Sequence, residues 1–95
     1  MASFTVRVML PGNPAEDQYV KLHEAMRRES FTRTITSNDG IEYHLPHAEY
    51  NISNGFNRSE VLNKAKTAAN GISSKAEILV TESSGRTWSN LKPVK

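Results

Sequence analysis

The chain has 95 residues, of which 37% are hydrophobic, and it carries a formal net charge of +2. This length predicts one domain, residues 1–95, with one modest core. Because the chain has no cysteine, disulfides, iron–sulfur clusters and thiol chemistry are excluded, and its weak positive charge permits binding to a polyanion without requiring it.

The N-terminal residues predict a half-buried strand. Apolar residues alternate with mostly polar ones over residues 4–10, so that one face of the strand carries Phe4, Val6, Val8 and Leu10. No long apolar run precedes this strand. We therefore expect neither a signal peptide nor a membrane span, and we expect a cytoplasmic protein.

A helix is predicted next, over about residues 14–29. Asn13 is placed to cap it, Pro14 suits the first helical position, and Glu16 falls where a capping box needs an acid. Its apolar face has helical spacing and consists of Tyr19, Leu22, His23 and Met26.

The next stretch predicts a hairpin. Residues 31–36 and 41–45 are rich in β-branched and aromatic residues, and Ser37-Asn38-Asp39-Gly40 lies between them. Asp-Gly is a strong hairpin signal, because both central residues of the favoured two-residue turn need a positive φ. Pro46 interrupts the second of these strands, since it cannot donate to a ladder, and residues 48–50 resume an extended path.

The C-terminal half predicts a second helix and another strand. Asn57-Arg58-Ser59-Glu60 repeats the capping pattern, and Asn70-Gly71 ends the helix, with Ile72 placed for a Schellman contact. Residues 76–81 form a strand. Residues 87–91, which include Trp88, form either a short fifth strand or a tail strapped across the core.

The order β-α-β-β-α-β predicts an α+β, ferredoxin-like sandwich with a four-stranded antiparallel sheet. Counted along the chain, its strands have the order 4-1-3-2, and both helices cover one face because such crossovers are right-handed. The predicted core is Phe4, Val6, Val8, Leu22, Met26, Tyr43, Val61, Ala65, Ile78 and Val80.

The opposite face of the predicted sheet is mostly polar. Arg7, Glu42 and His44 occupy positions where RNA-recognition motifs carry stacking aromatics, so stacking of RNA on this face is not expected. Met9 and Leu79 also lie on this face. We expect either a second subunit, giving a homodimer, or the Trp88 segment to cover them.

The histidines are the first candidates for chemistry. His23 is either a core-edge residue with one hydrogen bond or an acid–base group, and the same alternatives hold for the loop residues His44 and His47. The spacing of these histidines from Glu42 and Glu49 matches no tight ligand motif, so no metal site is predicted.

Three arginines are the candidates for phosphate contact. Arg27 and Arg28 end the first helix, where they favour the helix dipole or bind phosphate. By alternation Arg33 points to the same side as Phe31 and Ile35. It either snorkels at the sheet edge or faces a phosphate between the hairpin and the first helix.

Several stretches together carry a family resemblance: FTVRV, then Tyr19-x-x-Leu22-His23-x-x-Met26, then SFTRTI and GIEYHLP. In element order and apolar spacing this pattern resembles the small bacterial GhoS-type antitoxins. The resemblance implies a ferredoxin-like domain and a sequence-selective endoribonuclease that cleaves the messenger RNA of a toxin. That family also resembles the small dimeric ferredoxin-like nucleases of CRISPR adaptation.

The sequence departs from these families at two places. Leu10-Pro11-Gly12-Asn13 has no acid where the CRISPR-type nucleases hold a metal, and His23 stands where the antitoxin has an arginine. The resemblance then implies metal-independent attack by the ribose 2′-hydroxyl, which needs a base and a cation beside the phosphate. Activity should fall as a histidine base is protonated, near its ordinary pKa of about 6.5.

The hypothesis is an antitoxin-like endoribonuclease acting on single-stranded messenger RNA, without metal or small-molecule cofactor. Its catalytic residues are His23, Arg28 and His44, and its RNA-binding residues are Arg27, Arg33 and His47. The alternative is a non-catalytic dimeric interaction module.

Overall fold

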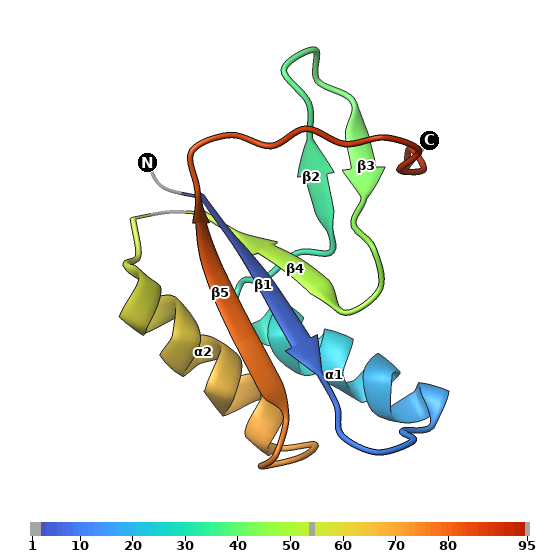
Figure 1. Ribbon diagram of the computed structural model, residues 1–95, viewed down its shortest axis with the longest axis vertical. Coiled ribbons are helices and arrows are strands. Elements are labelled where there is room, and N and C mark those ends of the chain that lie inside the picture. Colours follow the sequence, from blue (N-terminus) through green and yellow to red (C-terminus); the bar gives the residue numbers. More distant parts are fainter. Residues whose placement is uncertain (1–2, 54, 95) are drawn as a thin grey trace.

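A three-stranded antiparallel sheet covered on one face by two helices forms the body of the protein (Figure 1). The computed structural model describes residues 3–53 and 55–94. The elements are β1 (Ser3–Met9), α1 (Glu16–Arg28), β2 (Thr34–Thr36), β3 (Glu42–His44), β4 (Glu49–Ile52), α2 (Arg58–Asn70) and β5 (Glu77–Ser83). The predicted α+β class is confirmed.

β1 is the central strand, in the sheet order β4-β1-β5. It pairs with β5 along its whole length, from Ser3 opposite Ser83 to Met9 opposite Glu77. On its other side it pairs with β4. The predicted alternation is confirmed, because the side chains of Phe4, Val6 and Val8 are at most 1% exposed beneath the helices.

The structure differs from the predicted sheet in which strand pairs with β1. Residues 41–45, which were predicted to join this sheet, do not pair with β1. β4, from the stretch predicted only to continue in an extended path, pairs with β1 instead. Ala48, Tyr50 and Ile52 are each 1% exposed, whereas Ile41 is 43% exposed. The segment that can bury more apolar surface therefore joins the sheet, and the strands form a three-stranded and a two-stranded sheet.

β2 and β3 form the predicted antiparallel hairpin, which stands away from the three-stranded sheet in Figure 1. The Gly40 N–H donates to the Ser37 carbonyl at 2.9 Å, and Gly40 has a φ of +85° while Asp39 has no positive φ. This is a three-residue loop that ends in a left-handed glycine, not the predicted two-residue turn. Before the hairpin, Thr32 forms a single antiparallel bridge with Asn51 of β4.

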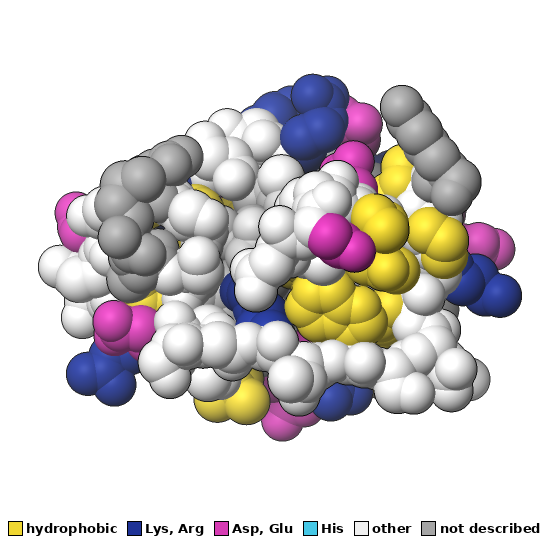
Figure 2. All heavy atoms as spheres, turned by 90° about the horizontal axis from the view of Figure 1, so that it is seen from above, with side chains coloured by type: hydrophobic (Ala, Val, Ile, Leu, Met, Phe, Trp, Pro, Cys, Tyr) yellow, Lys and Arg dark blue, Asp and Glu magenta, His cyan; other side chains and the backbone are white. Residues whose placement is uncertain are grey.

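The chain after β5 forms a tail along the hairpin, so the Trp88 segment is neither a fifth strand nor a tail across the core. The indole of Trp88 packs edge-on against Tyr43 with ring centroids 5.4 Å apart. The His44 N–H donates to the Lys92 carbonyl, and the Val94 N–H donates to the Glu42 carbonyl, each at 2.9 Å. Figure 2 looks onto this end of the molecule and shows a hydrophobic patch there.

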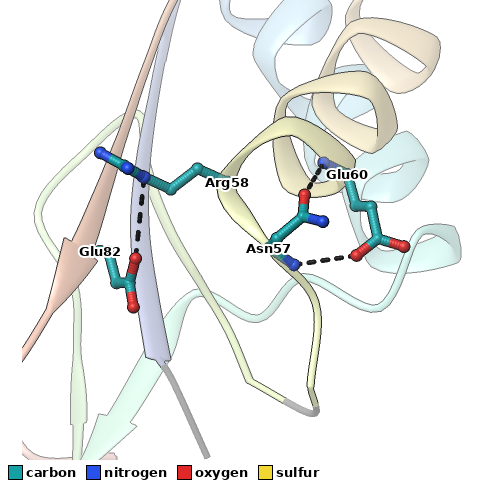
Figure 3. Close-up of polar contacts among 4 residues, drawn as sticks. All are labelled: Asn57, Arg58, Glu60 and Glu82. Atoms are coloured by element: carbon teal, nitrogen blue, oxygen red, sulfur yellow. Dashed lines mark hydrogen bonds and ion pairs between the residues drawn. The ribbon is translucent and has the colours of Figure 1, made fainter.

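The second helix begins as predicted. Asn57 Oδ1 accepts from the Glu60 N–H at 2.8 Å, and the Asn57 N–H donates to Glu60 Oε1 at 2.9 Å, which completes the capping box (Figure 3). Arg58 in the same turn pairs with Glu82 of β5 at 3.7 Å. At the other end Gly71 has a φ of −69°, so the predicted Schellman ending, which needs a left-handed residue, is wrong.

The first helix begins later than predicted. It starts at Glu16 after Ala15, whose side chain cannot cap, and Asn13 takes no part in the cap.

Among the described residues, neither helix has the length and apolar character that a membrane span needs.

Most of the predicted core is confirmed. Buried as predicted are Phe4, Val6, Val8, Leu22, Met26, Val61 and Ala65. Ile78 and Val80 are partly buried against that core, and Tyr43 is half-buried in the hairpin instead of joining it. The core residues missing from the prediction include Phe31, Tyr50 and Ile52, which follow from the place of β4 beside β1.

Candidate functional site

Four residues from distant parts of the chain meet at one side of the helix–sheet sandwich, where the charge of Arg33 acts on two of them. We call these four residues and Arg33 the histidine cluster: Tyr19, His23, Arg33, His47 and Tyr50. Tyr19 and His23 come from α1, one helical turn apart. Arg33 lies between α1 and β2, His47 lies in the loop after β3, and Tyr50 belongs to β4.

His23 and Tyr50 form the inner part of the cluster. His23 Nδ1 and the Tyr50 hydroxyl share a hydrogen bond of 2.6 Å. Tyr50 is 1% exposed, and its ring lies edge-on to Phe31 at 6.5 Å between centroids. The packed phenol thus fixes the orientation of an imidazole that is itself only half-buried.

Tyr19 and His47 form the outer part. The Tyr19 hydroxyl accepts from the Leu10 N–H at 3.1 Å, which anchors the ring at the end of β1. The His47 ring packs on the Tyr19 ring with centroids 4.4 Å apart. His47 is exposed, and its ring is nearly perpendicular to that of His23, with centroids 6.3 Å apart.

The surroundings hold His23 in its neutral form. Burial, and after it the positive charge of Arg33 and the neighbouring His47, lower the pKa of His23 from 6.5 to about 4. Burial raises the pKa of the Tyr50 phenol well above its ordinary value, although Arg33 opposes this. At neutral pH the inner pair is therefore an uncharged imidazole hydrogen-bonded to an uncharged phenol.

This arrangement can perform acid–base chemistry beside an anion. His23 uses one ring nitrogen for Tyr50, which leaves Nε2 for a substrate. The exposed His47 supplies a second imidazole, whose ring centroid lies 6.3 Å from that of His23. Arg33 supplies a permanent positive charge. Two imidazoles and a guanidinium provide a base, an acid and a charge partner for a phosphate.

The structure brings together only part of the predicted site. His23 and His47 meet in the histidine cluster, and the charge of Arg33 acts on His23. Arg27 is one turn after His23 on α1, but its guanidinium pairs with Glu24 at 2.9 Å on the surface. Arg28 lines a groove between α1 and α2, and His44 is exposed on β3, where it lies opposite Thr34. Arg27, Arg28 and His44 are therefore not counted among the residues of the histidine cluster.

Sequence reasoning missed both tyrosines as site residues. Tyr19 was assigned to the apolar face of the helix, and nothing local shows that its hydroxyl reaches Leu10. For Tyr50 a signal was present, because Ala48, Tyr50 and Ile52 alternate as in a buried strand. Among the described residues, no three side chains of the metal-binding types lie close enough to hold an ion.

Comparison with known proteins identifies no family for this chain. No protein-family model matches the sequence, and no curated protein matches it.

Proposed function

We propose that the protein is an antitoxin-like endoribonuclease that cleaves single-stranded messenger RNA at the histidine cluster. The observation that carries this proposal is that a neutral His23 lies beside an exposed His47, with ring centroids 6.3 Å apart, while the charge of Arg33 acts on His23. The resemblance of the sequence to GhoS-type antitoxins supplies the substrate class.

In the proposed reaction His23 Nε2 takes the proton of a ribose 2′-hydroxyl. The 2′-oxygen then attacks the adjacent phosphorus, and the bond from phosphorus to the 5′-oxygen breaks. His47 gives a proton to the departing 5′-oxygen, so that one proton is gained by His23 and one is lost by His47. Arg33 offsets the charge that develops on the phosphate oxygens. The products carry a 2′,3′-cyclic phosphate and a free 5′-hydroxyl.

Tyr50 has a positioning role in this mechanism. Its hydroxyl holds His23 Nδ1. When Nδ1–H is the donor, Nε2 carries the lone pair that a base needs. A phosphate bound at Arg33 would also offset the charge that lowers the His23 pKa, which makes the imidazole a stronger base once substrate is present.

A ferredoxin-like plan belongs to the same proposal. It is supported by the sheet order β4-β1-β5 and by the two helices on one face. It is also supported by the bridge between Thr32 and Asn51, which lies at the edge of β4 where a fourth strand of that plan would add.

The test is incubation of the purified protein with a pool of structured and unstructured RNAs, in chelator or in magnesium. Cleavage is expected under both conditions and should be lost in His23→Gln, His47→Gln and Arg33→Gln. His44→Gln is the matched control, because this exposed histidine lies outside the cluster, and it should cleave normally. An RNA with a 2′-deoxyribose at the cleavage position should stay intact.

Two results would contradict this mechanism: cleavage that requires magnesium, and cleavage that survives His23→Gln. If the protein neither binds nor cleaves any RNA, the alternative of a dimeric interaction module takes its place. That alternative is supported by Leu79, which is 64% exposed on the sheet face away from the helices.

A further inference from the structure

A polar cavity separates the open face of the sheet from the hairpin. It has a volume of about 420 Å³, within the range of small-ligand sites. Side chains from four segments line it, among them Thr32, Thr34, Asn51 and Arg86. Figure 2 shows a basic side chain recessed near the middle of this end of the molecule.

Arg86 is held in place by the sheet. The residue follows β5, and its Nε donates to Thr5 Oγ1 on the central strand at 3.0 Å. Asn51 lies directly opposite Thr5 in the neighbouring strand. The guanidinium and the Asn51 amide are therefore side by side over the middle of the sheet.

Both groups have unused hydrogen-bonding atoms. Arg86 Nη2 and Asn51 Oδ1 are buried without a hydrogen-bond partner. None of the ion pairs formed among the described residues includes Arg86, and burial lowers its pKa. A buried donor on a charged group is costly when nothing accepts from it, so an accepting group placed at Arg86 Nη2 would be stabilised there.

We infer that this cavity binds a phosphate group at Arg86. A guanidinium presents a planar set of donors that fits a phosphate, and such charge-assisted bonds are among the strongest in proteins. The hydroxyls of Ser3 and Ser53 line the same cavity 3.5 Å apart, and the one that does not donate to the other can donate to a remaining oxygen. Asn51 Oδ1 can accept from a hydroxyl of the ligand. Arg86 as a whole is only half-buried, so a ligand can reach its edge from the cavity.

A neighbouring space gives room for more than a phosphate. A second cavity of about 530 Å³ shares Ser3, Ile35, Thr36 and Arg86 with the first and continues to the Trp88 ring. An aromatic face beside a cation is suited to a nucleotide, whose base stacks while its phosphate pairs. The phosphate is thus supplied either as the free ion or as part of a nucleotide.

The site is separate from the histidine cluster and does not depend on RNA cleavage. Thr32 and Thr34 line the cavity, whereas Arg33 between them acts on His23. Likewise Asn51 faces the cavity while its neighbour Tyr50 lies in the core. One carboxylate, that of Glu42, also lines the cavity, and its Oε2 accepts from the Thr34 hydroxyl at 2.6 Å. Glu42 repels a bound anion, which gives a second means of testing the site.

The experiment is calorimetric titration of the full chain with inorganic phosphate and, separately, with uridine monophosphate, at ionic strength held constant with sodium chloride. The wild-type protein is expected to bind, and Arg86→Met should weaken binding by about 10-fold or more, because it removes a charge-assisted hydrogen bond. The matched control is Arg58→Met, which removes an exposed arginine elsewhere and should leave binding unchanged. Glu42→Gln should strengthen binding, and this variant keeps the test decisive if Arg86→Met does not fold.

Tighter binding of the nucleotide than of the free ion would support the site and assign a nucleotide to it. Equal binding would support the site with phosphate alone as the recognised group. The inference is overturned if the wild-type protein binds neither ligand, if Arg86→Met binds as well as wild type, or if Glu42→Gln leaves the affinity unchanged.

Discussion

His23 Nδ1 lies 2.6 Å from the hydroxyl oxygen of Tyr50, a hydrogen bond that joins α1 to β4 across 27 positions of sequence. The phenol reaches the imidazole from within the core, where Tyr50 is 1% exposed. A core residue therefore fixes the orientation of the proposed base His23. A substitution at Tyr50 should change both the stability of the fold and the proposed activity.

Tyr50→Phe keeps the ring and removes the hydroxyl. It should lower the free energy of unfolding by about 0.5–1.5 kcal/mol, because one hydrogen bond is lost and His23 Nδ1 loses its partner. Urea denaturation measures this change. Tyr43→Phe is the control, since that ring lies in the hairpin against Trp88, outside the core. Equal losses in the two variants would show that the bond to His23 adds nothing.

The low pKa of His23 makes stability depend on pH. The folded protein holds this pKa at about 4 against 6.5 ordinarily, so the unfolded chain binds the proton more readily. The contribution of His23 to stability is fully present above pH 6.5 and is lost as the pH falls through 4. Urea midpoints measured between pH 7.5 and 4 should fall more steeply for the wild type than for His23→Gln. Parallel curves would contradict this expectation.

The same pKa moves the expected acid limit of activity. An unperturbed histidine base would lose activity near pH 6.5, whereas His23 in the folded protein should stay neutral down to about pH 4. Initial rates of RNA cleavage at substrate concentrations well below KM measure this limit, because they report the free protein, in which no bound phosphate offsets Arg33. A loss of activity centred near pH 6.5 would assign the base to a group other than His23.

Two apolar residues of the sheet should differ in their contribution to stability. Val8 is 0% exposed, so Val8→Ala should cost about 1–3 kcal/mol through lost burial and a cavity. Ile78→Ala should cost less than a fully buried isoleucine would, because Ile78 is only partly buried. Thermal midpoints of the two variants check this, and an unchanged midpoint for Val8→Ala would show that this position is not core.

The two helix starts offer a matched pair of substitutions. Asn57→Ala should cost about 1 kcal/mol, because the Asn57 side chain caps α2. Asn13→Ala should leave stability nearly unchanged, because Asn13 does not cap α1. Chemical denaturation of both variants distinguishes Asn57, which caps its helix, from Asn13, which only lies in a sequence that resembles a helix cap.

Leu79 is the residue on which the proposed homodimer depends. Its side chain is 64% exposed on β5, so Leu79→Glu should weaken self-association by placing a charge in the interface. Sedimentation velocity at high micromolar concentration, with and without this change, measures the effect. A wild-type protein that remains monomeric there would remove the dimer from the proposal.

The local parts of the fold were predictable from the sequence, and the choice of strand partners was not. The alternation of Phe4, Val6 and Val8 and the capping pattern at Asn57 depend on near neighbours, and both appear in the structure. Whether residues 41–45 or β4 pairs with β1 depends on how much surface each buries in the complete fold. Ala48, which turns the chain into β4 with a φ of +68°, gave no glycine-like signal for that turn.

The residues of the candidate site were likewise predictable only where the evidence is local in sequence. His23 was identified because helical spacing places it on one face of α1, and Arg33 and His47 because they lie near the hairpin. Arg28 and His44 were grouped with them by proximity in sequence; in the structure Arg28 lines the groove between the two helices, and His44 lies opposite Thr34 in the hairpin. Tyr50 could not be paired with His23 locally, because their contact spans 27 positions.

The tail beside β3 has a consequence for unwanted sheet growth. The outer edge of a two-stranded hairpin is a template on which strands of other molecules can add. Here the chain occupies that edge itself, and Pro93 lies opposite Tyr43 between the two hydrogen bonds that fasten the tail. At this position the backbone nitrogen of Pro93 faces away from β3 and has no hydrogen to offer to a further strand. Residues 92–94 thus both complete the hairpin and close its edge at β3 to a further strand.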